Sequence, residues 1–257
     1  MKDLSGANIV VWFSCGVASA VAAKKTIEKY GTTNNVRVVN SPVYEEHVDN
    51  RRFLKDVEKW IGQEIEIVVN EKYPNSSAEE VWKKRKYMSG TKGAPCTNIL
   101  KKEARYQFEK NNAIDYHVLG FTSDEHARHN LFVLTERENL LSVLIDEWLT
   151  KQDCFTLISE AGIKVPEIYL LGYPNANCIG CVKATSPTYW NHVRKMHPDV
   201  FDSRANLSRE IGCRLTRVKG KRIFLDELPP DAKGRPMKNM TIECNIFCEE
   251  KIKSKKK

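Results

Sequence analysis

Residues 8–30 constrain the fold more strongly than any other stretch of this chain. Positions 9–13 form an unbroken apolar run rich in β-branched and aromatic residues, which is typical of a strand buried on both faces of a parallel sheet. Small residues follow at 14–19, and an alanine-rich run with helical spacing continues to Tyr30. This order of strand, tight turn and helix brings backbone N–H groups and the positive end of a helix dipole to one point, which attracts phosphate.

The side chains of the turn suit such a site. Ser14 and Ser19 can add hydroxyl donors, and Gly16 lets the backbone approach a ligand without a Cβ in the way. A tight strand-to-helix connection that binds nothing would use the same residue types, so the turn alone is a weak signal.

Alternating strand and helix patterns continue to about residue 165. Short apolar runs predict further strands at 36–39, 65–69, 115–120 and 140–145, with helices between them that include 51–61 and 98–110. Ser77 and Thr150 are expected helix caps. Asp49 follows the second strand, where it suits either a ribose hydroxyl or a helix N-cap. This alternation predicts an α/β fold built on a doubly wound, Rossmann-like parallel sheet.

The pattern changes after residue 165. A loop at 172–181, two short helices at 189–197 and 199–211, and a hairpin turning at Lys219–Gly220 are expected there. We therefore expect a nucleotide-binding α/β domain over 1–165, a cysteine-containing segment packed on it over 166–250, and a disordered basic tail over 251–257.

The net charge is concentrated at one end of the chain. Of the formal charge of +8, five positive charges are lysines at 251–257. We interpret this tail as solvated, with tethering of RNA or DNA as the alternative. There is no run of about eighteen apolar residues and no basic-then-apolar leader, so we expect a cytoplasmic protein with no membrane partner.

Eight cysteines stand at 15, 96, 154, 178, 181, 213, 244 and 248. In a cytosolic chain, close pairs indicate metal or redox chemistry sooner than structural disulfides. The spacing of Cys178 and Cys181 lets both sulfurs face one ion, and Cys96 precedes an expected helix whose dipole stabilises a thiolate. Together with Cys244 and Cys248 they would make either a zinc site or an iron–sulfur cluster. The other reading is a set of unrelated buried thiols, which fits Cys154 and Cys213.

The turn Phe13-Ser-Cys-Gly-Val-Ala-Ser19 resembles the pyrophosphate loop, Ser-Gly-Gly-x-Asp-Ser, of the adenine nucleotide α-hydrolase-like superfamily. That superfamily includes phosphoadenylylsulfate (PAPS) reductases and ATP pyrophosphatases. Ser14, Gly16 and Ser19 match the loop, whereas Cys15 replaces a glycine and Ala18 replaces the acidic residue. The resemblance implies an adenine nucleotide at this loop, and the loss of the acid counts against ATP cleavage.

A second resemblance concerns the cysteines. Iron–sulfur adenylylsulfate reductases carry a Cys-Cys pair before a lysine-bearing helix, and a later Cys-x-x-Cys in a Gly-Tyr-Pro-rich loop. This chain has Pro95-Cys96-Thr97 and then Gly172-Tyr-Pro174 ahead of Cys178 and Cys181, with Thr97 at the place of the second cysteine. Glu243-Cys244 matches the start of the C-terminal Glu-Cys-Gly-x-His motif, whose cysteine attacks sulfur in those reductases.

The leading interpretation is a PAPS-reductase-like oxidoreductase of sulfur metabolism. Cys244 would be the nucleophile, a thioredoxin-type thiol its reductant, and a 4Fe–4S cluster (zinc as the alternative) would be held by Cys96, Cys178, Cys181 and Cys248. A sulfonucleotide or ATP would be bound by Ser14, Cys15, Gly16, Ser19, Asn40, Glu125 and Arg128. One alternative is an ATP-dependent sulfurtransferase that thiolates RNA or another acceptor with an iron–sulfur cluster. Another is a nucleotide-binding module with a structural zinc knuckle.

Overall fold

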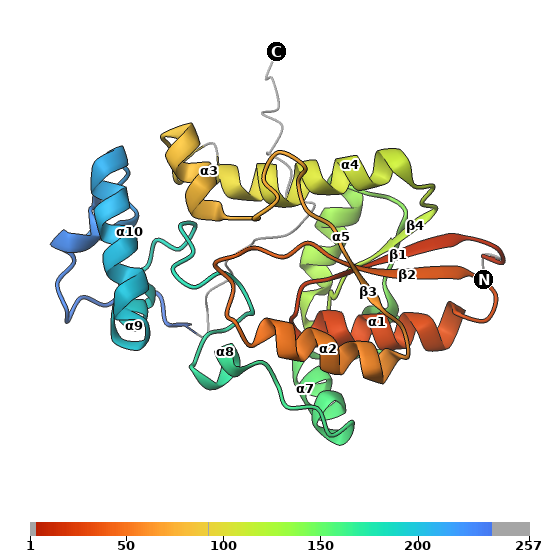
Figure 1. The fold of residues 1–257 in the computed structure, drawn as a ribbon. Helices are drawn as coiled ribbons and strands as arrows, with labels where there is room; N and C mark the ends of the chain where they lie inside the picture. The colour runs from red at the N-terminus through yellow and green to blue at the C-terminus, as the bar shows by residue number, and fades with distance from the viewer. Residues whose placement is uncertain (1–3, 92, 238–257) are drawn as a thin grey trace, which may run out of the picture.

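A computed structural model describes residues 4–91 and 93–237. Five parallel strands form one sheet in the order β3-β2-β1-β4-β5 (Figure 1). The strands are β1 (Asn8–Phe13), β2 (Asn35–Asn40), β3 (Ile65–Ile67), β4 (Tyr116–Val118) and β5 (Leu140–Leu141). The chain builds outward from β1 to β3 and then crosses to β4 on the other side, so the strand order reverses between β1 and β4. The predicted doubly wound α/β sheet is confirmed.

Helices cover both faces of the sheet, which explains the unbroken apolar run of β1. Ile9, Val11 and Phe13 share one core cluster with residues of α1 (Val17–Tyr30), α2 (Asn50–Ile61) and α7 (Lys151–Glu160). Val10 and Trp12 pack on the opposite face with Phe108 of α4 (Ala104–Asn111) and Phe132 of α5 (His126–Thr135) (Figure 1). A strand buried on both sides has no polar face to present, so its sequence does not alternate.

A helical lobe lies at one end of the sheet (Figure 1). It contains α9 (Pro187–Met196), α10 (Pro198–Ile211) and the antiparallel hairpin of β6 (Thr216–Val218) and β7 (Lys221–Ile223), which turns at Lys219–Gly220 as predicted. Its core also includes Val81 and Trp82 of α3 (Ala78–Arg85), which pack in one cluster with Trp190 and Leu215. Residues from the first half of the chain therefore help to build this lobe.

Two predicted caps are present. Thr150 and Asp153 form a reciprocal capping box at α7. The Ser77 hydroxyl accepts the N–H of Glu80, but the Glu80 carboxylate pairs with Lys84 instead of reaching back. The carboxylate of Glu45 caps the N-terminus of α3 instead, because it accepts hydrogen bonds from the N–H groups of Ala78 and Glu79 at 2.8 and 3.0 Å. The start of α3 is thus fixed by a residue more than thirty positions away.

Several elements differ from the sequence-based expectation. The strands expected at 65–69 and 115–120 are shorter, at Ile65–Ile67 and Tyr116–Val118. The strand expected at 140–145 ends at Leu141, and the short helix α6 (Val143–Asp146) follows Ser142. The helix expected at 98–110 begins as a π-helix, η1 (Thr97–Glu103), and continues as α4. Helix α8 (Glu167–Leu170) was not expected. Among residues 4–91 and 93–237, none of the helices combines the length and apolar character needed to cross a bilayer.

Asp49 joins α2 to α8. It stands at the N-cap position of α2 but makes no side-chain cap; its two carboxylate oxygens accept from the Arg52 guanidinium at 2.7 Å. One of them also accepts the N–H of Glu167 at 2.8 Å. The hydrogen bonds from Arg52 lower the pKa of Asp49 to about 2, against the opposing effect of burial.

The low pKa of Asp49 predicts a component of acid unfolding. A carboxyl group whose pKa is lowered by folding adds stability above its unfolded-state pKa near 4, and this contribution is lost as the pH falls toward 2. We expect Asp49→Asn to lower the free energy of unfolding by about 1–2 kcal/mol at pH 7 and by much less near pH 2. Urea unfolding across this pH range measures the difference, and a pH-independent deficit would contradict the assignment.

Candidate functional site

Three chain segments meet at the carboxyl-terminal edge of the sheet. The loop at 14–16 follows β1, Asn40 ends β2 with Ser41 directly after it, and residues 119–128 follow β4. This edge includes the point between β1 and β4 where the strand order reverses. In doubly wound sheets, ligands bind in the crevice outside the strand ends at such a point.

The loop after β1 is held in shape by Ser19. The Ser19 hydroxyl accepts the N–H of Ser14 at 3.1 Å and donates to the carbonyl oxygen of Gly16 at 2.9 Å. Cys15 has a φ of 56°, in the left-handed region that a glycine would adopt more easily. Gly16 is the N-cap of α1 and places no side chain over the first turn of the helix. The backbone N–H groups of this turn are the donors that an anion would use.

A glycine after β4 allows the sheet to meet this loop closely. A Cβ added at Gly120 would lie 2.7 Å from the Ser19 nitrogen and 2.9 Å from the Ala18 carbonyl carbon, which is closer than a real side chain can stand. The end of β4 therefore packs directly against the first turn of α1. The sequence showed only that the strand ends in a glycine.

Asn40 and Cys15 lie beneath the loop. The buried Asn40 amide donates to the Phe13 carbonyl oxygen at 2.8 Å and lies 3.7 Å from the Cys15 sulfur. Burial raises the pKa of the Cys15 thiol well above its usual value, and the nearby Glu46 carboxylate acts in the same direction. The Cys15 thiol therefore stays protonated at neutral pH. In this structure both side chains support the loop from inside.

A buried ion pair that sequence reasoning missed lies beside Cys15. Lys101 of η1 contacts Glu46 at 3.2 Å, and their side chains are only 10% and 9% exposed. The Lys101 ammonium also lies 3.5 Å from the Ser41 carbonyl oxygen at the end of β2. Burial raises the pKa of Glu46, although Lys101 opposes this shift. Lys101 thus links the helix that follows Cys96 to the carboxyl-terminal edge of the sheet.

Glu125 and Arg128 lie after β4, as expected, and they bind each other. Glu125 ends the short 3₁₀ helix η2 (Ser123–Glu125), and Arg128 lies in the first turn of α5. Their side chains form an ion pair at 2.5 Å, and the Arg128 guanidinium stacks over the Phe121 ring at 5.2 Å. Both side chains are about one-third exposed, so they remain accessible at this edge of the sheet.

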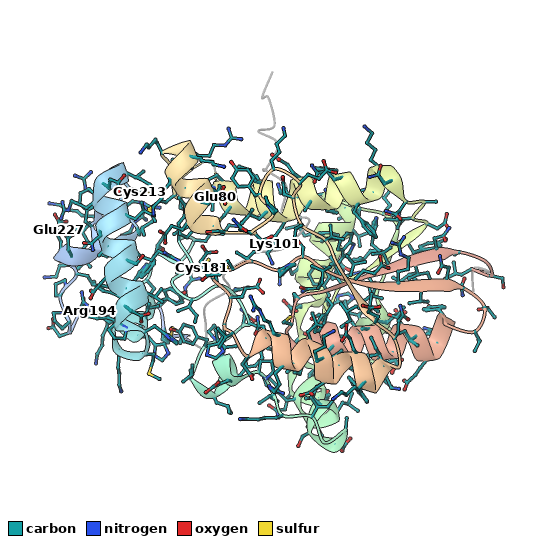
Figure 2. The ribbon with its side chains drawn as sticks, viewed as in Figure 1. Glu80, Lys101, Cys181, Arg194, Cys213 and Glu227 are labelled. Carbon is teal, nitrogen blue, oxygen red and sulfur yellow. The ribbon has the colours of Figure 1, made fainter. Side chains whose placement is uncertain are left out.

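Cys96, Cys178 and Cys181 belong to one hydrophobic cluster in the helical lobe. Cys181 is buried, and the other two are partly buried against the same core. The Tyr189 hydroxyl accepts the N–H of Cys181 at 2.8 Å and donates to the Cys178 carbonyl oxygen at 3.5 Å, which fixes the turn between them. In Figure 2, Cys181 and Lys101 both lie in the region between the lobe and the sheet.

The described thiols are not grouped as metal ligands. Within 4–91 and 93–237, no three histidine, cysteine or carboxylate side chains lie close enough together to hold a metal ion. Cys244 and Cys248 lie outside the described residues.

The loop at 172–181 is tied at several points to segments at the carboxyl-terminal edge of the sheet. Lys151, at the start of α7, donates to the Pro174 carbonyl oxygen at 2.7 Å and to the Asn175 side chain at 2.9 Å. The N–H of Ile179 donates to the Glu45 carbonyl oxygen at 3.0 Å. The loop that contains Cys178 and Cys181 is thus anchored to the segment that follows β2 and to the first residue of α7.

The two cysteines expected to be unrelated buried thiols have separate surroundings. Cys154 of α7 is fully buried in the core cluster that α7 shares with α1 and the sheet, and burial raises its pKa to about 12. The Cys213 thiol donates to the Ser89 carbonyl oxygen at 3.2 Å at the end of α10.

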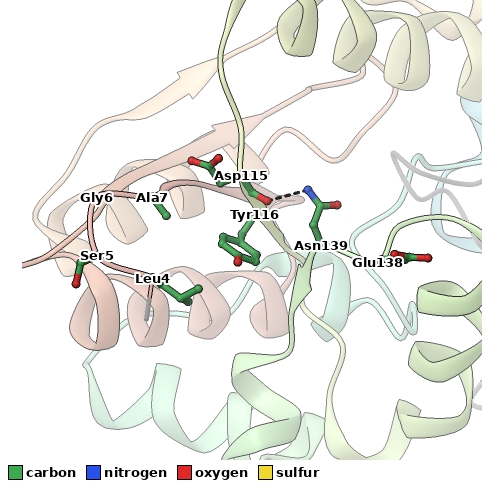
Figure 3. Close-up of a pocket in the computed structure, with 8 residues that line it drawn as sticks. All are labelled: Leu4, Ser5, Gly6, Ala7, Asp115, Tyr116, Glu138 and Asn139. Atoms are coloured by element: carbon green, nitrogen blue, oxygen red, sulfur yellow. Dashed lines mark hydrogen bonds between the residues drawn. The ribbon is translucent and has the colours of Figure 1, made fainter. Parts of the chain in front are cut away.

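A surface hollow opens at the opposite edge of the sheet (Figure 3). It is lined by residues 4–7 together with Asp115, Tyr116, Glu138 and Asn139, and the Asn139 amide donates to the Asp115 carbonyl oxygen at 2.9 Å. The hollow lies at the amino ends of β1, β4 and β5 and is lined by two carboxylates. An anionic nucleotide is therefore not expected there.

The sheet and the loop at its switch point place the protein in the doubly wound α/β class. No family model matches the sequence, and no curated protein matches it significantly. Among solved structures, a PAPS reductase from Candida auris has 12% identity and a TM-score of 0.46, covering 66% of this chain and 81% of that one. A U34-tRNA thiolase from Methanococcus maripaludis, solved with its 4Fe–4S cluster, has 13% identity and a TM-score of 0.47, covering 82% and 68%.

Proposed function

We propose that this protein binds an adenine sulfonucleotide at the loop 14–19 and reduces it by cysteine chemistry, as PAPS reductases do. The observation that carries the proposal is the meeting of two loops at one edge of the sheet. One loop ends at the N-terminus of the fourteen-residue helix α1. The other contains Cys178 and Cys181 and is anchored to that edge through Lys151 and Glu45.

The phosphate loop would work mainly through its backbone. The first-turn N–H groups of α1 and the positive end of its dipole suit the charged oxygens of a phosphate. The Ser14 side chain is exposed beside them. Glu125 and Arg128 would lie near the base and the ribose or a second phosphate, and Arg128 is the residue of this pair that suits an anion.

The proposed reaction takes place at sulfur. The Cys244 thiolate attacks the sulfur of the sulfonucleotide, a sulfur–sulfur bond forms, and the bond from sulfur to the phosphate oxygen breaks with its electron pair leaving on the nucleotide. A thioredoxin-type dithiol then attacks the Cys244 sulfur and releases sulfite. Its second thiol resolves the mixed disulfide, so the dithiol is oxidised and the Cys244 thiol is regenerated.

The ligand set Cys96, Cys178, Cys181 and Cys248 is proposed from spacing and resemblance. Four thiolates suit a 4Fe–4S cluster or zinc, and either would hold the loop 172–181 and the start of η1 together. Cys96, Cys178 and Cys181 belong to one core cluster. Among the described residues, however, no three potential ligands lie close enough together to hold a metal ion. No step of the proposed reaction uses the metal.

The five lysines at 251–257 favour a second candidate, a sulfurtransferase that thiolates RNA. Incubation with a sulfonucleotide or with ATP, each in the presence of a dithiol and transfer RNA, separates the two functions. Sulfite release from the sulfonucleotide supports the reductase. ATP cleavage with thiolated RNA would replace it by the sulfurtransferase, and nucleotide binding without turnover would leave a binding module.

A further inference from the structure

The hairpin of β6 and β7 concentrates positive charge on the helical lobe. Over residues 212–224 the chain contains no aspartate or glutamate. The cationic side chains of this stretch are all exposed, and they are Arg214, Arg217, Lys219, Lys221 and Arg222. The proposed reaction at the sheet edge uses none of them.

The two faces of the hairpin differ in character. On the inner face, Thr216 is fully buried, and Val218 and Ile223 pack against the core of the lobe. On the outer face, Arg217 stands directly opposite Arg222 across the two strands. Side chains that are directly opposite in an antiparallel pair lie on the same face, and like charges there destabilise the pairing. The outer face is therefore built around an unfavourable pair of arginines.

No carboxylate relieves this repulsion within the part of the chain that the structure describes. Among residues 4–91 and 93–237, none of the five cations forms an ion pair with an aspartate or glutamate. The acidic residues that follow the hairpin, Asp226 and Glu227, are bound by Arg209 of α10 at 2.7 and 3.1 Å. The exposed lysines of α3 differ, since Lys83 and Lys84 pair with carboxylates one turn away at 2.8 and 2.7 Å. The hairpin thus has charges that an external anion can neutralise.

Backbone contacts hold the two arginines in place. The N–H of Arg217 donates to the Thr185 carbonyl oxygen at 3.0 Å, which fixes β6 to the segment that follows Cys181. The guanidinium of Arg222 donates to the Arg214 carbonyl oxygen at 3.1 Å. Charges that are already positioned lose less conformational freedom when a ligand binds, so less of the binding free energy is lost to ordering.

The composition of this face indicates which class of anion it fits. None of the large exposed apolar side chains of the described chain lies within 187–237. The face therefore has no apolar side chain to insert into a bilayer and none to form the apolar centre of a protein interface. Guanidinium and ammonium groups on a narrow ribbon suit the repeated phosphates of a nucleic acid, which bind such groups without any reading of the base sequence.

We propose that the outer face of the hairpin, residues 214–222, binds the sugar-phosphate backbone of a nucleic acid. Arg217 and Arg222 contact phosphate oxygens, and the anion removes the repulsion between them. Lys219 in the turn and Lys221 beside it extend the contact along the backbone. Because this surface shares no residue with the candidate nucleotide site, binding of a nucleic acid is independent of the proposed reaction.

The test compares the full-length protein with Arg217→Gln/Arg222→Gln. Fluorescence anisotropy gives the Kd for a short labelled RNA strand and for a short labelled DNA duplex, both of mixed sequence, between about 50 and 200 mM salt. The wild-type Kd should rise steeply with salt. The variant should bind at least roughly tenfold more weakly, with a salt slope smaller by about 1.4 to 1.8, because two phosphate contacts are lost. The probe that binds more tightly identifies RNA or DNA as the source of the backbone.

Three further variants serve as controls. Lys83→Gln/Lys84→Gln removes the same charge from α3 and should bind like the wild type. Arg217→Lys/Arg222→Lys keeps the charge and should retain most of the affinity. Lys219→Gln/Lys221→Gln leaves the arginine pair intact and should weaken binding as the first variant does. The melting temperature of Arg217→Gln/Arg222→Gln should be no lower than that of the wild type, because a like-charge pair is removed.

Failure of the wild type to bind either nucleic acid would overturn the proposed surface. An equal loss of affinity in the α3 control would overturn it as well, because binding would then follow net charge alone. Affinity that survives in both glutamine variants of the hairpin, but is lost when the lysines at 251–257 are replaced by glutamine, would assign binding to that segment instead. Binding to phosphatidylserine vesicles without binding to nucleic acid would replace the proposed partner by a membrane surface.

Discussion

Replacing Gly16 by valine should abolish adenine nucleotide binding and leave the fold intact. A Cβ at Gly16 would lie 3.2 Å from the Tyr169 hydroxyl oxygen, and 3.7 and 3.9 Å from the hydroxyl oxygens of Ser14 and Ser19. Two further methyl groups would fill the space over the first turn of α1, where phosphate oxygens are proposed to bind. The φ of −95° and ψ of 153° at Gly16 are ordinary for any residue, so the backbone itself is not strained.

We expect the Kd for the sulfonucleotide to rise at least about 100-fold, on the order of 3 kcal/mol, because several hydrogen bonds to a charged ligand are lost together. Calorimetry measures the Kd, and circular dichroism and the melting temperature show whether the fold is retained. Ser19→Ala is the graded comparison. It should weaken binding by roughly 1–2 kcal/mol, because the Ser19 hydroxyl shapes the loop through Ser14 and Gly16. A folded Gly16→Val protein that binds like the parent would remove the loop from the site.

Replacing Cys178 or Cys181 by serine should release bound metal and destabilise the helical lobe. Metal held by thiolates adds its binding free energy directly to folding, so we expect a loss of several kcal/mol and a lower melting temperature for the lobe. The measurements are the metal content of protein purified without oxygen and the thermal unfolding curve.

Cys213→Ser is the matched control, because serine retains a donor for the Ser89 carbonyl oxygen and the metal content should not change. Cys154→Ser should likewise leave the metal content unchanged, while burying a hydroxyl in the core beside α1. Full metal occupancy in the Cys178/Cys181 double variant would exclude these two residues as ligands.

The parts of the fold that could be predicted are those determined by residues close together in the sequence. The apolar run of β1, the small residues at 14–19 and the capping box at Thr150 each fix local structure, and all three appear where expected. The strand at β5 is shorter than its apolar run because the chain turns into α6 after Ser142. The sequence after Cys96 gives no signal for a π-helix. A π-helix differs from an α-helix only in that each backbone hydrogen bond spans one more residue.

The places of the candidate residues in the fold could be predicted, but their contacts could not. Asn40 does end β2 at the expected edge, yet its amide binds the Phe13 carbonyl oxygen inside the protein. The direction in which a side chain at a strand end points depends on the residues around it in space, and the sequence alone does not give their positions. Lys101 with Glu46, and Tyr169 with Gly16, lie side by side although the members of each pair are 55 and about 150 residues apart in the sequence. No local sequence pattern predicts such pairs.

Mass spectrometry of the protein after incubation with adenosine 5′-phosphosulfate, without any reductant, tests the central claim most directly. If Cys244 attacks the sulfur, the enzyme should retain one sulfonate group on the peptide that contains Cys244, and a later addition of thioredoxin-type dithiol should release it as sulfite. The Cys244→Ser protein should bind the nucleotide and gain no adduct. A wild-type protein that binds the sulfonucleotide but remains unmodified, or carries the adduct on another cysteine, would contradict the proposed reaction.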